Sequence, residues 1–117
     1  MSVEISSSFQ ITVDVAITAG TAIVIQNQIR SMRVVSVEVT GQETAVVSVG
    51  RLRNGVTDVF ASGTLGANAV NQPILVSSIA NATFQPGDDI DIGSATADTL
   101  QVILHCTGSP SQQMSFA

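Results

Sequence analysis

The chain has 117 residues, which is enough for one domain with a single hydrophobic core. Hydrophobic residues make up 44% of the chain and charged residues only 11%, and the many Val, Ile and Thr residues favour strands over helices. The formal net charge is −5, Lys is absent, and every charged residue after Asn54 is acidic, so we expect no nucleic-acid binding, because a phosphate backbone would be repelled.

The first forty residues predict a polar arm and three strands. Residues 1–8 are polar and predict a loose N-terminal arm. Apolar and polar residues alternate with a period of two over 9–17, which predicts a strand with one buried face. A second strand is predicted over 22–26. A third is predicted over 33–40, and its alternation places Val35, Val37 and Val39 on one face.

The segment 44–62 predicts a tight β-hairpin. Two strand-like runs meet at Asn54-Gly55, a dipeptide that readily adopts the positive φ angles of a two-residue type I′ turn. The turn fixes the register between the two strands. The expected cross-strand pairs are Arg53 with Val56, Arg51 with Asp58 as an exposed ion pair, and Val49 with Phe60.

The second half predicts a long connection and three more strands. Residues 63–73 are expected to form the connection, which Pro73 ends, and 74–80 the next strand. A turn over 85–88 leads to a short strand over 90–92. The last strand is predicted over 99–107 and is apolar on both faces, which is typical of a central strand. The tail 108–117 is polar except for two residues.

About eight strands joined by turns, without a helical period, predict an all-β fold. We expect residues 1–117 to form a single two-sheet antiparallel sandwich that is jelly-roll-like, with an open Greek-key barrel as the alternative. The uncharged stretch 59–87 is interrupted by Gly, Asn and Pro throughout, so no membrane helix is predicted. The N-terminus lacks the pattern of a secretory signal, so we expect assembly in a cytoplasm.

No catalytic constellation is evident in the sequence, and we expect no enzymatic activity. His105 and Cys106 are adjacent, but successive side chains of a strand point to opposite faces, so they cannot form a dyad there. We expect Cys106 in the core and His105 at a surface or an interface. The nucleophile-elbow motif and the nucleotide-binding glycine motifs are absent, and no cofactor is predicted.

An acidic cluster follows the turn near residue 87. Asp88, Asp89 and Asp91 could hold a structural cation such as calcium, because hard cations prefer carboxylate oxygens. The alternative is a solvated turn followed by a charged edge strand, in which acidic side chains discourage pairing with other chains. We favour the second interpretation and predict no metal site. With a single Cys and a single His, the chain also lacks the usual zinc ligands.

Four residues are the best candidates for partner binding. Arg30 and Arg33 are cations in an acidic chain and can bind a carboxylate on a partner or a sister subunit. Met114 and Phe116 are the two apolar residues of the tail and could anchor it on a neighbour. A sugar-binding site is disfavoured because Trp and Tyr, which usually stack on sugar rings, are absent.

Several stretches together resemble the small decoration, or cement, proteins of tailed-phage capsids, which have a jelly-roll-like sandwich. The stretches are GRLRNGVTDVFASGTL, ATFQPGDDIDI and the last strand LQVILHCTG, and the likeness covers roughly residues 9–107. It implies a dimer or trimer that binds the major capsid protein on the outside of the virion, at symmetry axes, and stabilises the head. Other structural virion components, such as a head fibre base or tail protein, and a carbohydrate-binding module are the alternatives.

Overall fold

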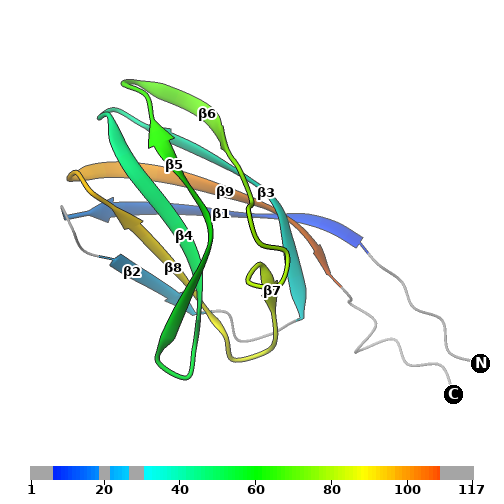
Figure 1. Ribbon diagram of the computed structural model, residues 1–117. Helices are drawn as coiled ribbons and strands as arrows, with labels where there is room; N and C mark the ends of the chain where they lie inside the picture. The colour runs from blue at the N-terminus through cyan, green and yellow to red at the C-terminus, as the bar shows by residue number, and fades with distance from the viewer. Residues whose placement is uncertain (1–6, 19–21, 27–30, 109–117) are drawn as a thin grey trace, which may run out of the picture.

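In the computed structural model, residues 7–18, 22–26 and 31–108 are described, and they consist of strands and loops (Figure 1). No helix in these residues could cross a membrane. The strands are β1 (Ser7–Ile17), β2 (Ala22–Gln26), β3 (Met32–Gly41), β4 (Ala45–Arg53), β5 (Val56–Leu65), β6 (Ala69–Ile74), β7 (Thr83–Phe84), β8 (Asp89–Ser94) and β9 (Asp98–Gly108).

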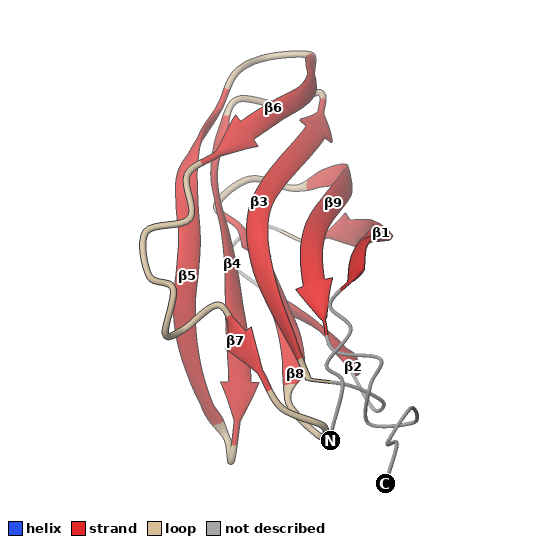
Figure 2. Cartoon of the chain, turned by 90° about the vertical axis from the view of Figure 1, so that its right-hand side faces the viewer, coloured by secondary structure: helices blue, strands red, loops and turns tan. Residues whose placement is uncertain are grey.

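The strands form two antiparallel sheets that face each other (Figures 1 and 2). One sheet has the order β1-β9-β3-β6, and the short β7 pairs with the first two residues of β3, Met32 and Arg33. The other sheet has the order β2-β8-β4-β5. Apart from the two-residue β7, the first strand pairs with the last, the second with the second to last, and so on inward to the central hairpin. This is the jelly-roll arrangement, and it confirms the predicted sandwich.

The core lies between the sheets because alternate residues of each strand point inward. Val13 and Val15 of β1, and Leu104 of β9, are examples from the five-stranded sheet, and they are at most 9% exposed. The rings of Phe60 and Phe84 meet edge to face, with centroids 5.8 Å apart and planes at 86°. Both rings are fully buried, and burial of each contributes roughly 2–3 kcal/mol.

The predicted hairpin is present, but its register changes halfway along. Asn54 and Gly55 have φ values of 52° and 78°, as the type I′ turn requires, and Arg51 lies opposite Asp58. Beyond Gly50 the register shifts, so Val49 faces Ala61 and the predicted Val49–Phe60 pair is wrong. The extra residue is a β-bulge, which brings both Phe60 and Ala61 into the core.

The sixth strand occupies Ala69–Ile74 rather than the predicted 74–80, so 63–73 is not a long connection. Pro73 lies within the strand, opposite Glu38 of β3. A strand at the edge of a sheet tolerates proline because one side of its backbone needs no ladder partner. Residues 75–82 form a loop alongside β5, where the Ser77 N–H donates to the Phe60 carbonyl at 2.7 Å (Figure 2).

A second bulge changes the predicted orientation of Val35 in β3. Val34 pairs with Cys106 and Ser36 with His105, so Val35 is the extra residue. Val34, Val37 and Val39 are buried, whereas the Val35 side chain is 51% exposed. The prediction that Val35 shares the face of Val37 and Val39 is therefore wrong, and an apolar side chain lies on the outside of the five-stranded sheet.

Candidate partner-binding surface

The outer face of the five-stranded sheet carries a row of aligned side chains. In the ladder, Gln10 of β1 lies opposite His105 of β9, and His105 lies opposite Ser36 of β3. Val35 stands beside this row, and Leu75, which follows β6, is 78% exposed. The face therefore combines exposed apolar groups with few charges.

Two open hollows flank Val35 on this face. The hollow over β1 and β9 has a volume of about 550 Å³, and its lining includes Phe9 and His105. The hollow over β6 has a volume of about 400 Å³, and its lining includes Leu75. Val35, Ser36 and Glu38 line both hollows. Val35 thus forms a ridge between two depressions, which is a shape that a complementary protein surface can match.

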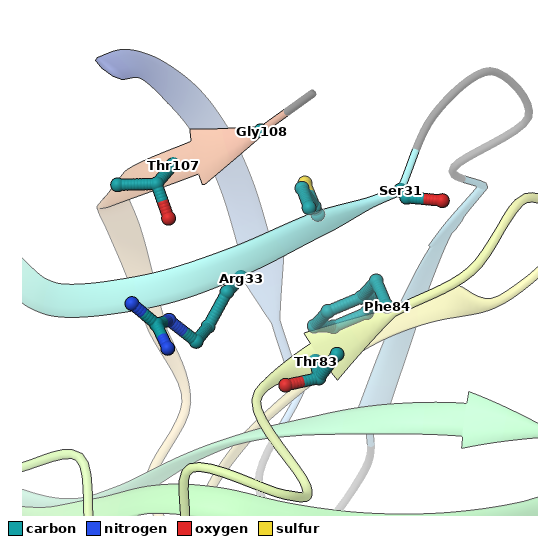
Figure 3. Close-up of a pocket in the computed structure, with 7 residues that line it drawn as sticks. Ser31, Arg33, Thr83, Phe84, Thr107 and Gly108 are labelled. Carbon is teal, nitrogen blue, oxygen red and sulfur yellow. The ribbon is translucent and has the colours of Figure 1, made fainter. Parts of the chain in front are cut away.

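Arg33 lies at the end of β3, beside a third hollow of about 290 Å³. The Arg33 side chain extends from β3 near Thr107 of β9 and Thr83 of β7, and Met32 and Phe84 also line the hollow (Figure 3). Arg33 is exposed and forms no ion pair with any described residue. Of the four predicted partner-binding residues, only Arg33 is described; Arg30, Met114 and Phe116 lie outside the described residues.

Arg51 has a structural role within the sandwich. Its side chain is only 11% exposed, and Nη2 lies 3.1 Å from Asp58 Oδ2, which confirms the predicted pair but not its exposure. Nη1 also donates to the carbonyl oxygens of Ala80 and Thr83, at 3.0 and 2.9 Å. Arg51 therefore ties the β4–β5 hairpin to the loop that leads into β7.

Arg53 and Asp88 form a second internal ion pair. Arg53 Nε and Nη2 donate to the two carboxylate oxygens of Asp88 at 2.8 and 2.6 Å, and the Gln85 N–H donates to Asp88 at 2.7 Å. The hydrogen bond from Arg53 is the main cause that lowers the pKa of Asp88, against the opposing effect of burial. The same bond raises the pKa of Arg53.

The acidic cluster is engaged in protein contacts. Asp88 is held by Arg53, and Asp91 accepts a hydrogen bond from the Thr57 hydroxyl at 2.9 Å. Among the described residues, no group of three or more His, Cys, Asp or Glu side chains is arranged to hold a metal ion. The predicted solvated turn and charged edge strand are wrong in two respects: Asp88 is only 4% exposed, and β8 lies between β2 and β4 rather than at an edge.

His105 and Cys106 point to opposite faces of β9, as predicted. Cys106 is buried in the core, whereas His105 is partly exposed on the outer face. His105 Nε2 lies 3.3 Å from Glu38 Oε1, but the contact lacks hydrogen-bond geometry. The pair belongs to the exposed sheet face rather than to an enclosed site.

No protein-family model matches the chain, and a search of curated proteins finds no relative. The function is therefore inferred from the fold and from the surface of the sandwich.

Proposed function

We propose that this protein is a structural virion protein that decorates a phage head: an oligomer that binds the outer capsid surface and stabilises it. The observation that carries the proposal is the jelly-roll pairing of the strands, because viral capsid domains commonly have this architecture. One fold can serve many functions, so the jelly roll supports this role by analogy. The resemblance in sequence points to the same class of protein.

The first and last described residues of the sandwich lie close together, which suits a protein that binds neighbouring subunits through its two flanking segments. Ser7 of β1 lies opposite Gly108 of β9, so both ends of the described sandwich are at one end of the five-stranded sheet (Figure 1). The flanking segments start from this end, beside Arg33. We infer that they contact the major capsid protein, with Met114 and Phe116 as apolar anchors.

A decoration protein needs no catalytic group, because it acts by mass action. A ligand that binds only the assembled head stabilises it by about 2.7 kcal/mol per site when its free concentration is a hundred times the dissociation constant. Arg51 and Arg53 join the hairpin to the segment 80–88, and such contacts suit a protein that serves as a scaffold.

Two other functions compete with this proposal. A head fibre base or tail component would use the same scaffold in another part of the virion. A carbohydrate-binding module is a second possibility, since jelly rolls include lectins. It is less well supported, because Phe9 and Phe84 are the only aromatic residues among those that line the three hollows described above, and neither is Trp or Tyr.

The proposal is tested by co-sedimentation of the purified chain with unexpanded and expanded heads of the phage that encodes it. We expect saturable binding to expanded heads and a rise in the temperature at which they burst. The double variant Met114→Ser/Phe116→Ser should lose this binding, whereas Val46→Ser, on the outer face of the other sheet, should retain it. A folded oligomer that binds neither kind of head would refute the proposal.

A further inference from the structure

We infer that the outer face of the five-stranded sheet pairs with the same face of a second copy, around a two-fold axis that follows the row Gln10–His105–Ser36. The inference deepens the proposed function, which requires an oligomer, by assigning the subunit interface. It can also be tested without a capsid, because the pairing is a property of the free protein.

The two opposite charges of β3 are placed symmetrically about this row. Arg33 lies opposite Thr107 and Glu38 lies opposite Ile103, and these two β9 residues are each two positions from His105. Arg33 is three residues from Ser36 along the chain, whereas Glu38 is only two. Because the bulged Val35 has no partner in the ladder, both charges nevertheless lie two ladder positions from Ser36. At about 3.3 Å per residue, each charge lies roughly 7 Å from the row.

A two-fold axis along the row therefore brings Arg33 of one copy over Glu38 of the other, twice in each dimer. Facing strands then run antiparallel, and each residue contact is repeated by symmetry, as in isologous interfaces. An axis along β3 would instead place Arg33 over Arg33 and Glu38 over Glu38, which like-charge repulsion disfavours. The charge pattern thus favours the axis across the strands over an axis along β3.

The apolar groups of the face lie close to the same axis. Val35 stands beside Ser36, and Leu75 follows Ile74, which pairs with Val37 next to Ser36. The side chains of Val35 and Leu75 are 51% and 78% exposed. In the dimer each of these groups lies beside the axis and therefore near its counterpart, with Val35 between the two charges of β3 and Leu75 at the β6 edge of the face.

The size of the face is sufficient for a stable dimer. Strands of 11, 11, 10 and 6 residues, at about 3.3 Å per residue and spaced by about 4.8 Å, give a planar area of about 600 Å². The accessible area of the face exceeds this planar area because side chains project from the sheet. The result is comparable to the roughly 800 Å² per partner that a standard protein interface buries. The hollows on either side of Val35 provide space in which side chains from the second copy can interdigitate.

The first test is a charge exchange followed by sedimentation equilibrium of the free protein. Arg33→Glu and Glu38→Arg, each alone, should raise the dimer dissociation constant by about tenfold or more, because both symmetric pairs become repulsive. The double variant Arg33→Glu/Glu38→Arg should restore dimerisation, since the pairs become complementary again. A double variant as weak as the single variants would overturn the inference.

Substitution of two similarly exposed valines distinguishes between the two outer faces of the sandwich as the dimer interface. Val35 and Val46 are 51% and 52% exposed on strands of different sheets. Val35→Glu should dissociate the dimer, and Val46→Glu should leave it intact. The reverse result would place the interface on the other sheet, and a wild-type monomer or trimer would exclude this two-fold pairing.

Crosslinking tests the axis without altering a charge. Ser36→Cys places an exposed thiol beside the axis, so a short bis-maleimide should link two copies efficiently. Ser62→Cys, exposed on the other sheet, is the control and should remain uncrosslinked, as should the wild-type chain, whose Cys106 is buried. Equal crosslinking of both variants would contradict the proposed axis.

Capsid binding distinguishes failure of this inference from failure of the proposed function. A monomeric protein that still binds expanded heads would refute the dimer and leave the decoration role intact. A dimer that responds to the charge exchange but ignores heads would support the interface and refute the decoration role. Loss of head binding in a monomeric Arg33→Glu variant, with a wild type that is also monomeric, would assign the face to the capsid instead.

Discussion

Arginines on the two sheets of the sandwich differ in what surrounds them, although both kinds lie near β7: Arg33 is opposite Thr83 in the ladder, and Arg51 donates to the Thr83 carbonyl. At the β4–β5 hairpin, Arg51 and Arg53 find carboxylates and carbonyl oxygens of the same chain within hydrogen-bond distance. At the start of β3, Arg33 finds no carboxylate among the described residues. The comparison shows that a cation whose acceptors are internal stabilises the fold, whereas one without them is available to a partner.

The largest effect should come from Arg51, which has three internal acceptors. Arg51→Ala removes the contacts to Asp58, Ala80 and Thr83, and we expect the free energy of unfolding to fall by about 3 kcal/mol. Urea denaturation of the full chain measures this change. A loss below about 0.5 kcal/mol would show that the hairpin end does not depend on Arg51, and the comparison would then fail.

Asp88 should give a smaller effect that depends on pH. Asp88→Asn loses the charged hydrogen bonds to Arg53, and we expect a loss of about 2 kcal/mol at pH 7. The pKa of Asp88 is lower in the folded state, so its contribution is present above the ordinary Asp pKa of about 3.9 and is lost as the pH falls through the folded value.

The difference in unfolding free energy between wild type and Asp88→Asn should therefore shrink on acidification below about pH 4. Urea denaturation of both proteins at a series of pH values measures this difference. Glu43→Gln, at an exposed position, is the control and should change stability by less than about 0.5 kcal/mol. A difference that grows as the pH falls would contradict the prediction that the charged Asp88 carboxylate stabilises the fold.

The smallest effect on stability should come from Arg33. Arg33→Ala should change the free energy of unfolding by less than about 0.5 kcal/mol, because the side chain is exposed and has no internal ion pair. The same variant should weaken dimerisation in sedimentation experiments. A loss of stability comparable to that of Arg51→Ala, measured where the chain is monomeric, would remove the distinction between Arg33 and Arg51.

Local patterns in the sequence predicted much of the fold. Alternation identified the strands that became β1 and β3, an apolar run identified β9, and Asn54-Gly55 identified the hairpin, because these signals depend on near neighbours. Bulges depend on packing between strands that are distant in the sequence, so the register shift at Phe60 could not be predicted. Pro73 was misleading because its effect depends on whether the strand lies at a sheet edge.

The candidate surface was predicted only in part. Arg33 stood out because cations are rare in this chain, but Val35, Glu38 and Leu75 did not. One signal was available: Val34 and Val35 are adjacent apolar residues in a strand, and regular alternation cannot bury both. Which of the two is exposed depends on the pairing of Val34 with Cys106, which is set by the fold.

The pairing of the first strand with the last has a consequence for folding. β9 lies between β1 and β3, yet it is the last of the nine described strands to be synthesised. The five-stranded sheet therefore cannot close until β9 is available, whereas the β4–β5 hairpin can form early from local contacts. Such long-range pairing slows folding to milliseconds or seconds in typical β-sandwiches. We expect the outer face of the five-stranded sheet to be completed last, so self-association would follow synthesis of the whole sandwich.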